Sequence, residues 1–179
     1  MPHFAKTRAA AAPDEIALRD PGQELTWSDV DDALNRCADL ILAADLGPAN
    51  RVAVFAENAA ETALAHLGAL LGGASSVPVN FHLTADEAAY ILEDSQSRIL
   101  FVGPETVERG VAAARAAGVD TVIGWNCSDL VDTIEGIDAD AVIDWHDWLA
   151  QGSTDDPPDD VVPLPNLLYT SGTTGRPKG

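Results

Sequence analysis

The stretch RVAVFAENAAETALAHLGALLGGASSVPV, residues 51–79, places two short apolar runs on either side of a helix-like segment. Residues 51–56 and 74–79 are rich in valine and small apolar side chains, which is typical of buried strands. Between them, Asn58 is followed three residues later by a glutamate, a cap-like helix start, and the Gly–Gly pair at 72–73 ends the segment. A strand, a helix and a second strand in this order predict parallel strands joined by a crossover helix.

The same alternation continues downstream. Residues 98–102 and 121–123 are apolar runs that predict two more strands. Helices are expected over 84–93, where a Thr-x-x-Glu capping signal opens the segment, and over 104–118, which a proline opens and a glycine closes. The predicted fold class is therefore α/β, with a mainly parallel sheet flanked by helices.

Upstream of the strand–helix–strand stretch, residues 16–20 and 23–27 flank a Pro–Gly turn dipeptide and predict a small hairpin. Ser28 is expected to cap the helix that follows, and a Gly–Pro pair at 47–48 ends that segment. The apolar positions of this helix recur at helical spacing and are Val30, Ala33, Leu34, Cys37, Ala38 and Ile41.

Acidic residues dominate the segment 125–162, where the alternation breaks down and turns, a short helix over 144–149 and a linker rich in Asp and Pro are expected. Twelve acids and no lysine or arginine lie between Arg115 and Arg176, and the net charge of the chain is −19. We expect this segment to be largely exposed, and nucleic acid and anionic membranes to be poor partners. A high-salt habitat or a cationic partner is an alternative origin of the charge. The acids are Asp120, Asp129, Asp132, Glu135, Asp138, Asp140, Asp144, Asp147, Asp155, Asp156, Asp159 and Asp160.

The cysteines, one histidine and the tryptophans are expected to have structural roles in packing. Cys37 and Cys127 are expected to be buried, unpaired thiols in a reducing compartment, so a cytoplasmic protein without a transmembrane segment is predicted. His66 is expected to be a packed or edge histidine, and no Cys/His cluster has metal-ligand spacing. The tryptophans of the acidic segment are expected to pack locally; they are Trp125, Trp145 and Trp148.

The last stretch, LLYTSGTTGRPKG at 167–179, has the chemistry of a phosphate cradle. Its glycines let backbone N–H groups approach an anion, its hydroxyls add neutral donors, and Lys178 adds a compact positive charge. The spacing does not fit a Walker A loop. The apolar run 164–169 in front of it predicts a short buried strand.

This stretch resembles the signature loop of the adenylate-forming superfamily, which contains acyl- and aryl-CoA synthetases, peptide-synthetase adenylation domains and luciferases. The resemblance implies that the loop holds the β- and γ-phosphates of ATP while a carboxylate attacks the α-phosphorus, with Mg²⁺ expected from ligands elsewhere and coenzyme A as the acyl acceptor. The implied phosphate-binding residues, with Lys178 also catalytic, are Thr170, Ser171, Gly172, Thr173, Thr174, Gly175 and Lys178.

Upstream blocks are also similar to CoA ligases and cover most of residues 14–102. Residues 80–84, NFHLT, are closer to the Asn-x-Arg-Leu-Thr pattern of fatty acyl-CoA synthetases than to peptide-synthetase adenylation domains, although His82 replaces the usual arginine. The resemblance therefore implies an ATP-dependent acyl-CoA synthetase that activates a carboxylic, fatty acid. Another adenylate-forming branch or a truncated, non-catalytic binding module stays open as an alternative.

The expected organisation is one partial domain over residues 1–179, because members of the superfamily are about three times longer. It divides into an α/β core at 14–124, the acidic irregular segment and linker at 125–162, and the strand with its phosphate-binding loop at 163–179. The rest of the large domain and a C-terminal domain are expected outside these residues, so the 179-residue chain alone is predicted to be inactive. Its expected partners are the small-molecule substrates; the oligomeric state is left open.

Overall fold

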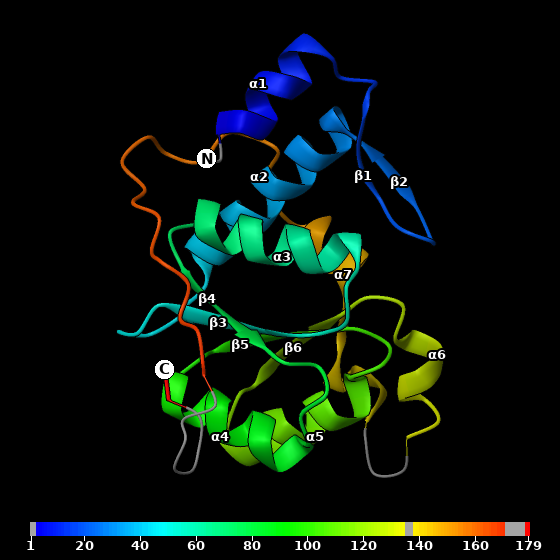
Figure 1. Cartoon of the computed structure of the whole chain (residues 1–179), viewed down its shortest axis with the longest axis vertical. Coiled ribbons are helices and arrows are strands. Elements are labelled where there is room, and N and C mark those ends of the chain that lie inside the picture. The colour runs from blue at the N-terminus through cyan, green and yellow to red at the C-terminus, as the bar shows by residue number, and fades with distance from the viewer. Residues whose placement is uncertain (1–2, 135–137, 171–177) are drawn as a thin grey trace.

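The computed structural model describes residues 3–134, 138–170 and 178–179. Within them, five parallel strands form one sheet in the order β4-β3-β5-β6-β7, with a separate antiparallel hairpin, β1 and β2 (Figure 1). The sheet strands are β3 Arg51–Phe55, β4 Ser75–Val79, β5 Ile99–Val102, β6 Thr121–Gly124 and β7 Ile143–Asp144, and the hairpin strands are β1 Ile16–Arg19 and β2 Glu24–Thr26.

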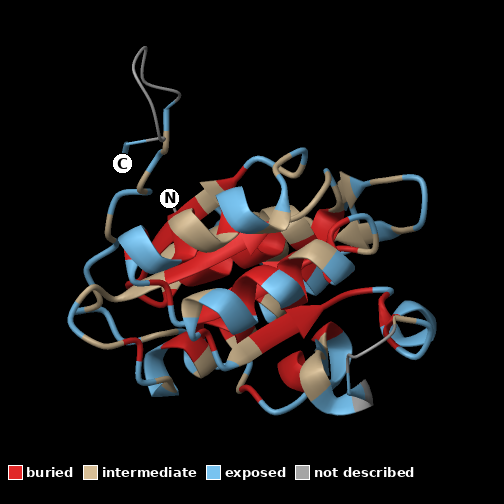
Figure 2. Cartoon of the chain, turned by 90° about the horizontal axis from the view of Figure 1, so that it is seen from below, coloured by how far each residue is buried: buried red, intermediate tan, exposed pale blue. Residues whose placement is uncertain are grey.

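Helices cover both faces of the sheet (Figure 1). One face carries α2 Trp27–Ala43, α3 Ala60–Leu71 and α7 Trp145–Leu149, with α1 His3–Ala11 packed outside α2, and the other carries α4 Ala85–Ser95 and α5 Val107–Ala117. Figure 2 shows the strands buried between exposed outer helix surfaces. Each face has its own apolar cluster, so the alternation of strand and helix builds a three-layer α/β fold, as predicted.

The order of the strands creates a switch point. From β3 the chain crosses to β4 on one side, and then returns to place β5, β6 and β7 on the other side. In open parallel sheets of this order, the crevice outside the carboxyl ends of the strands at such a reversal is the usual position for a ligand. Here the reversal lies between β3 and β5.

Most strands and helices lie where the sequence predicts them. The hairpin, the strands β3 to β6 and the helix with the Thr84–Glu87 capping box are confirmed, with ends that differ by a few residues. Cys37 and Cys127 are free and buried. The close approach of α2 and α3 depends on Gly68, because a Cβ at this position would lie 2.4 Å from the Cys37 sulfur.

Two predicted helix caps are wrong. Helix α2 begins at Trp27, and its cap is Thr26, whose side chain accepts from the Asp29 N–H while Asp29 accepts from the Thr26 N–H. Ser28 lies inside the first turn, between the two members of this Thr-x-x-Asp box. Asn58 does not cap α3; the N–H of Ala60 donates instead to Asp20 of the hairpin turn at 2.9 Å.

The acidic segment is more ordered than the charge pattern predicts. It contains α6 Ser128–Val131, the 3-10 turn Ala139–Ala141, β7 and α7, so the sheet continues beyond β6. Its acids are mainly exposed, whereas the three tryptophans are buried, as expected. Trp145 and Trp148 pack edge-on against Phe101 of β5, and Trp125 packs edge-on against Trp145. Apolar anchors at separate points hold the segment in the core despite the repulsion between its carboxylates.

Residues 164–169 are not the predicted buried strand. They are extended and partly exposed, and one backbone hydrogen bond joins them to the sheet, from the Leu167 N–H to the Ser76 carbonyl at 3.0 Å. Pro163 and Pro165 have no N–H to donate, which prevents a continuous ladder along the edge strand β4. Helix α1 was also not predicted, since its nine residues have almost no amphipathic pattern. None of the described helices is long and apolar enough to cross a membrane.

Candidate phosphate-binding loop

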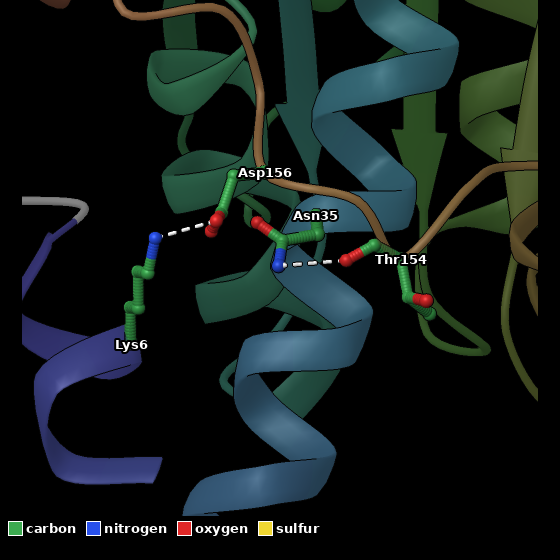
Figure 3. Close-up of polar contacts among 4 residues, drawn as sticks. All are labelled: Lys6, Asn35, Thr154 and Asp156. Carbon is green, nitrogen blue, oxygen red and sulfur yellow. Dashed lines mark hydrogen bonds and ion pairs between the residues drawn. The ribbon is translucent and has the colours of Figure 1, made fainter. Parts of the chain in front are cut away.

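The loop predicted to bind phosphate is reached through residues 152–169, which we call the edge strap. Its first part lies against α1 and α2: Asn35 donates to the Thr154 carbonyl at 3.1 Å, and Lys6 forms an ion pair with Asp156 at 2.5 Å (Figure 3). Arg36 donates to the Gly152 carbonyl at 2.7 Å. These contacts fix the start of the strap to the helical layer above the sheet.

The strap then crosses the open edge of the sheet at β4. In Figure 1 it runs from the layer of α2 and α3 past β4 to the layer of α4. The Ser75 hydroxyl donates to the Pro165 carbonyl at 2.7 Å, and Leu167 donates to Ser76 as described above. The hydrogen bond from Leu167 occupies the Ser76 carbonyl of the edge strand β4. Without this bond, the carbonyl would be open to solvent or to another chain.

Tyr169 fixes the far end of the strap. Its hydroxyl donates to the Asp94 carboxylate at the end of α4, at 2.5 Å, and its ring packs on the apolar cluster of that face. Burial, followed by the hydrogen bond to Asp94, raises the pKa of Tyr169 well above its usual value. The phenol therefore stays a neutral donor at any physiological pH.

Thr170 and Lys178 are brought together directly after Tyr169. Each donates its backbone N–H to the carbonyl of the other, at 3.1 and 3.2 Å, in an antiparallel bridge. Residues paired in this way project their side chains to the same side of the pair, with Cβ atoms about 5.5 Å apart. A hydroxyl and an ammonium thus leave the chain next to each other, and both residues are exposed.

This donor set fits a phosphate group and does not fit a metal ion. The threonine hydroxyl and the lysine ammonium both donate hydrogen bonds to anionic oxygen, and the lysine adds charge. No group of three or more His, Cys, Asp or Glu residues that could hold a metal occurs in the part of the chain that the structure describes. The other predicted phosphate ligands lie outside the described residues and are Ser171, Gly172, Thr173, Thr174 and Gly175.

The sequence pattern did not identify the residues that support the loop. Tyr169 and Asp94 are 75 positions apart, and Lys6 and Asp156 are 150 apart, so no local spacing links them. Only the placement of α1 and α4 on opposite sides of the β4 edge brings these partners to the strap.

The sequence has relatives among known proteins. A sequence model of the AMP-binding enzyme family matches residues 5–179. The long-chain-fatty-acid–CoA ligase FadD13 of Mycobacterium tuberculosis is 32% identical over 97% of this chain and 33% of its own length. The phosphinothricin tripeptide synthetase PhsB of Streptomyces viridochromogenes is also 32% identical, over all of this chain and 14% of its own length.

The fold has solved counterparts. The inhibitor-bound N-terminal domain of FACL13 from Mycobacterium tuberculosis superposes with a TM-score of 0.75 and 28% identity, covering 99% of this chain and 42% of that one. The chain thus spans about a third of the length of the curated ligase that it resembles.

Proposed function

The chain belongs to the AMP-binding enzyme family, and from this premise we propose that it is the N-terminal part of an ATP-dependent acyl-CoA synthetase. The proposed reaction activates a carboxylic acid, a fatty acid, as an acyl-adenylate with release of pyrophosphate, and then transfers the acyl group to coenzyme A. The observation that supports the proposal most directly is the backbone pair of Thr170 and Lys178, because a hydroxyl and an ammonium are both donors suited to a phosphate.

In this proposal the loop acts on the leaving group. Pyrophosphate carries the negative charge that develops as the α-phosphorus is attacked, and Lys178 stabilises that charge while Thr170 positions the phosphate. The hydroxyl and backbone N–H groups of residues 171–175 are proposed as the remaining donors. Mg²⁺ would neutralise further phosphate charge, with ligands from outside the described residues.

Two observations support the fatty acid as substrate. The NFHLT pattern at 80–84 is similar to that of fatty acyl-CoA synthetases, and a relative at 32% identity is named a long-chain-fatty-acid–CoA ligase. The second candidate is activation of an amino acid, which the equal identity to a tripeptide synthetase favours. Both branches would use the same loop for the same half-reaction.

A substrate panel separates these candidates. The full-length protein that carries these residues is incubated with ATP, labelled pyrophosphate and, in turn, fatty, aryl and amino acids, and the label that enters ATP is counted. We expect exchange with fatty acids and formation of an acyl-CoA thioester when coenzyme A is added. Exchange restricted to amino acids would replace the proposal with the second candidate.

We also propose that the 179-residue chain by itself does not form acyl-CoA. Thr170 and Lys178 supply donors for phosphate, but the described residues around them provide no apolar tunnel for an acyl chain; the apolar cavity of about 210 Å³ is lined by α1, the hairpin, α2 and α3. Fatty-acid-dependent pyrophosphate exchange by the purified chain would contradict this. The two buried free thiols support a reducing compartment, and we propose the cytoplasm.

A further inference from the structure

A polar cleft of about 540 Å³ lies at the carboxyl ends of the strands, at the switch point between β3 and β5. It is bounded by the turn of the β1–β2 hairpin, the start of α3, and the loops that follow β3, β5 and β6. Tyr169, at the end of the edge strap, lies elsewhere, because its hydroxyl is bonded to the C-terminal end of α4, which precedes the opposite ends of the strands. The lining residues central to the cleft are Gln23, Glu57, Asn58, Glu61, Trp125 and His146.

Two residues that line this cleft each carry a buried polar atom without a hydrogen-bond partner among the described residues. One is the Oε2 of Glu57 and the other is the indole Nε1 of Trp125, a residue that is 1% exposed. A buried donor or acceptor without a partner costs free energy, so such groups are usually explained by a bound molecule or by function. Two of them in one cleft indicate that something polar binds there.

The Glu57 carboxylate lies against the turn that follows β5. The Glu105 backbone N–H donates to its Oε1 at 3.4 Å, and the carboxylate lies against Gly103, where a Cβ would come within 2.5 Å of Oε2. Thr106 closes this turn by donating to the Phe55 carbonyl. A carboxylate held by the backbone of two strand ends is preorganised to accept from a ligand.

The other two carboxylates of the cleft are already engaged. Asp20 accepts from the N–H groups of Gly22, Gln23 and Ala60, and Glu61 accepts from the Gln23 amide at 2.6 Å. Among these three acids, Glu57 is the one with a buried oxygen that lacks a hydrogen-bond partner among the described residues. No lysine or arginine of the described residues lines the cleft, so the three carboxylates favour a cation and disfavour phosphates and carboxylates.

We propose that this cleft binds a small primary amine that carries a hydrogen-bond acceptor beside its ammonium group, such as an amino amide. The ammonium donates to Glu57 Oε2, and the neighbouring acceptor takes the indole N–H of Trp125. One such ligand satisfies both unpartnered atoms, whereas an ammonium without an acceptor, or a neutral amide without a charge, satisfies only part of the site.

Glycinamide is the probe for this site, and propionamide is its matched control, since it replaces the ammonium with a methyl group of similar size. Each is titrated into the ¹⁵N-labelled 179-residue chain while the indole N–H resonances of the four tryptophans are followed by NMR. We expect the Trp125 resonance, assigned with the Trp125→Phe variant, to shift to saturation with glycinamide at millimolar concentration. Propionamide is expected to bind at least tenfold more weakly.

Glu57→Gln keeps the shape of the side chain and removes the charge, and we expect it to weaken glycinamide binding at least tenfold. Glu108→Gln changes an exposed acid in the first turn of α5, which does not line the cleft, and should leave binding unchanged. Equal shifts with the two amides would overturn the proposal. The absence of a saturable shift of the Trp125 resonance would also overturn it, and would leave water as the only occupant of the cleft. The comparison of the two amides needs no variant, so the test stands even where Glu57→Gln does not fold.

Discussion

Asp20 joins two parts of the chain through a single carboxylate. In its own turn it accepts from the N–H of Gly22 at 2.7 Å and of Gln23 at 3.0 Å, and it also accepts from Ala60 at the start of α3. The hydrogen bond from Ala60, the largest contribution, and those from the turn lower the pKa of Asp20. The hairpin thus caps a helix that lies 40 residues away in the sequence.

We predict that Asp20→Ala lowers the free energy of unfolding by about 1 kcal/mol, the usual effect of losing a helix cap. Urea denaturation at neutral pH measures the change, and Asp14→Ala, at an exposed acid before the hairpin, is the control. Because the folded pKa of Asp20 is lowered, its contribution is complete above the ordinary carboxyl pKa and is lost as pH falls through the lowered value. Equal effects of the two substitutions would contradict the capping role.

His66 predicts a second pH dependence, of the same sign but nearer to neutrality. Its Nδ1 is 2.5 Å from the Ser76 hydroxyl, and burial lowers its pKa below 6.5. Below pH 6.5 the unfolded chain binds a proton that the native imidazole does not, so the free energy of unfolding should fall as pH decreases. Above pH 6.5, His66 should not make the free energy of unfolding depend on pH.

Urea denaturation between pH 5 and 8 tests this expectation. We expect His66→Gln to flatten the dependence around pH 6, whereas His82→Gln, at an exposed histidine, should leave the curve unchanged. A His66→Gln curve parallel to that of the unmodified chain would show that His66 is not the source of the slope.

At the scale of elements, hydrophobic periodicity was sufficient for strands β3 to β6 and for α2 to α5, because each buries a continuous apolar face. It failed where order depends on distant partners. Helix α1 has little apolar periodicity of its own and is held by packing on α2, and β7 is only two residues long and is defined by its pairing with β6. The loop's donor chemistry was readable from composition, whereas Tyr169 and Asp94, which position it, were not.

The edge strap gives the element-scale prediction. We expect Tyr169→Phe to accelerate amide hydrogen exchange at Thr170 and Lys178 by roughly tenfold, because a hydrogen bond to a charged group is lost next to their backbone pair. Asp94→Asn should act in the same direction. Asp86→Asn, at an exposed acid in the first turn of α4, is the control, and unchanged exchange in Tyr169→Phe would show that the hydroxyl does not support the loop.

For the whole molecule the dominant quantity is the net charge of −19. Three exposed ion pairs, Lys6–Asp156, Arg8–Glu15 and Arg19–Glu24, use basic residues of the first 24 positions, while acids of the second half face solvent. Exposed ion pairs contribute little to the free energy of unfolding, so little stability is lost when salt screens them. Screening the repulsion among the acids should have the larger effect.

We therefore predict that the melting temperature rises between low salt and about 0.5 M sodium chloride. A gain of about 1 kcal/mol would correspond to roughly 2–4 °C for a chain of this size. Scanning calorimetry or fluorescence measures the change. A melting temperature that stays flat or falls would show that ion pairs outweigh repulsion.

Lys178 carries the central claim, and the chain offers a matched control, because Lys6 is its only other lysine. In the full-length protein, Lys178→Ala should slow fatty-acid-dependent exchange of pyrophosphate into ATP by one to three orders of magnitude, roughly the effect of removing one electrostatic stabiliser of a transition state. Lys6→Ala should slow this exchange much less, because Lys6 contacts only the start of the edge strap, through its ion pair with Asp156. Thioester formation from a supplied acyl-adenylate should suffer much less in Lys178→Ala, and an equal loss in both half-reactions would contradict a role for Lys178 on the pyrophosphate.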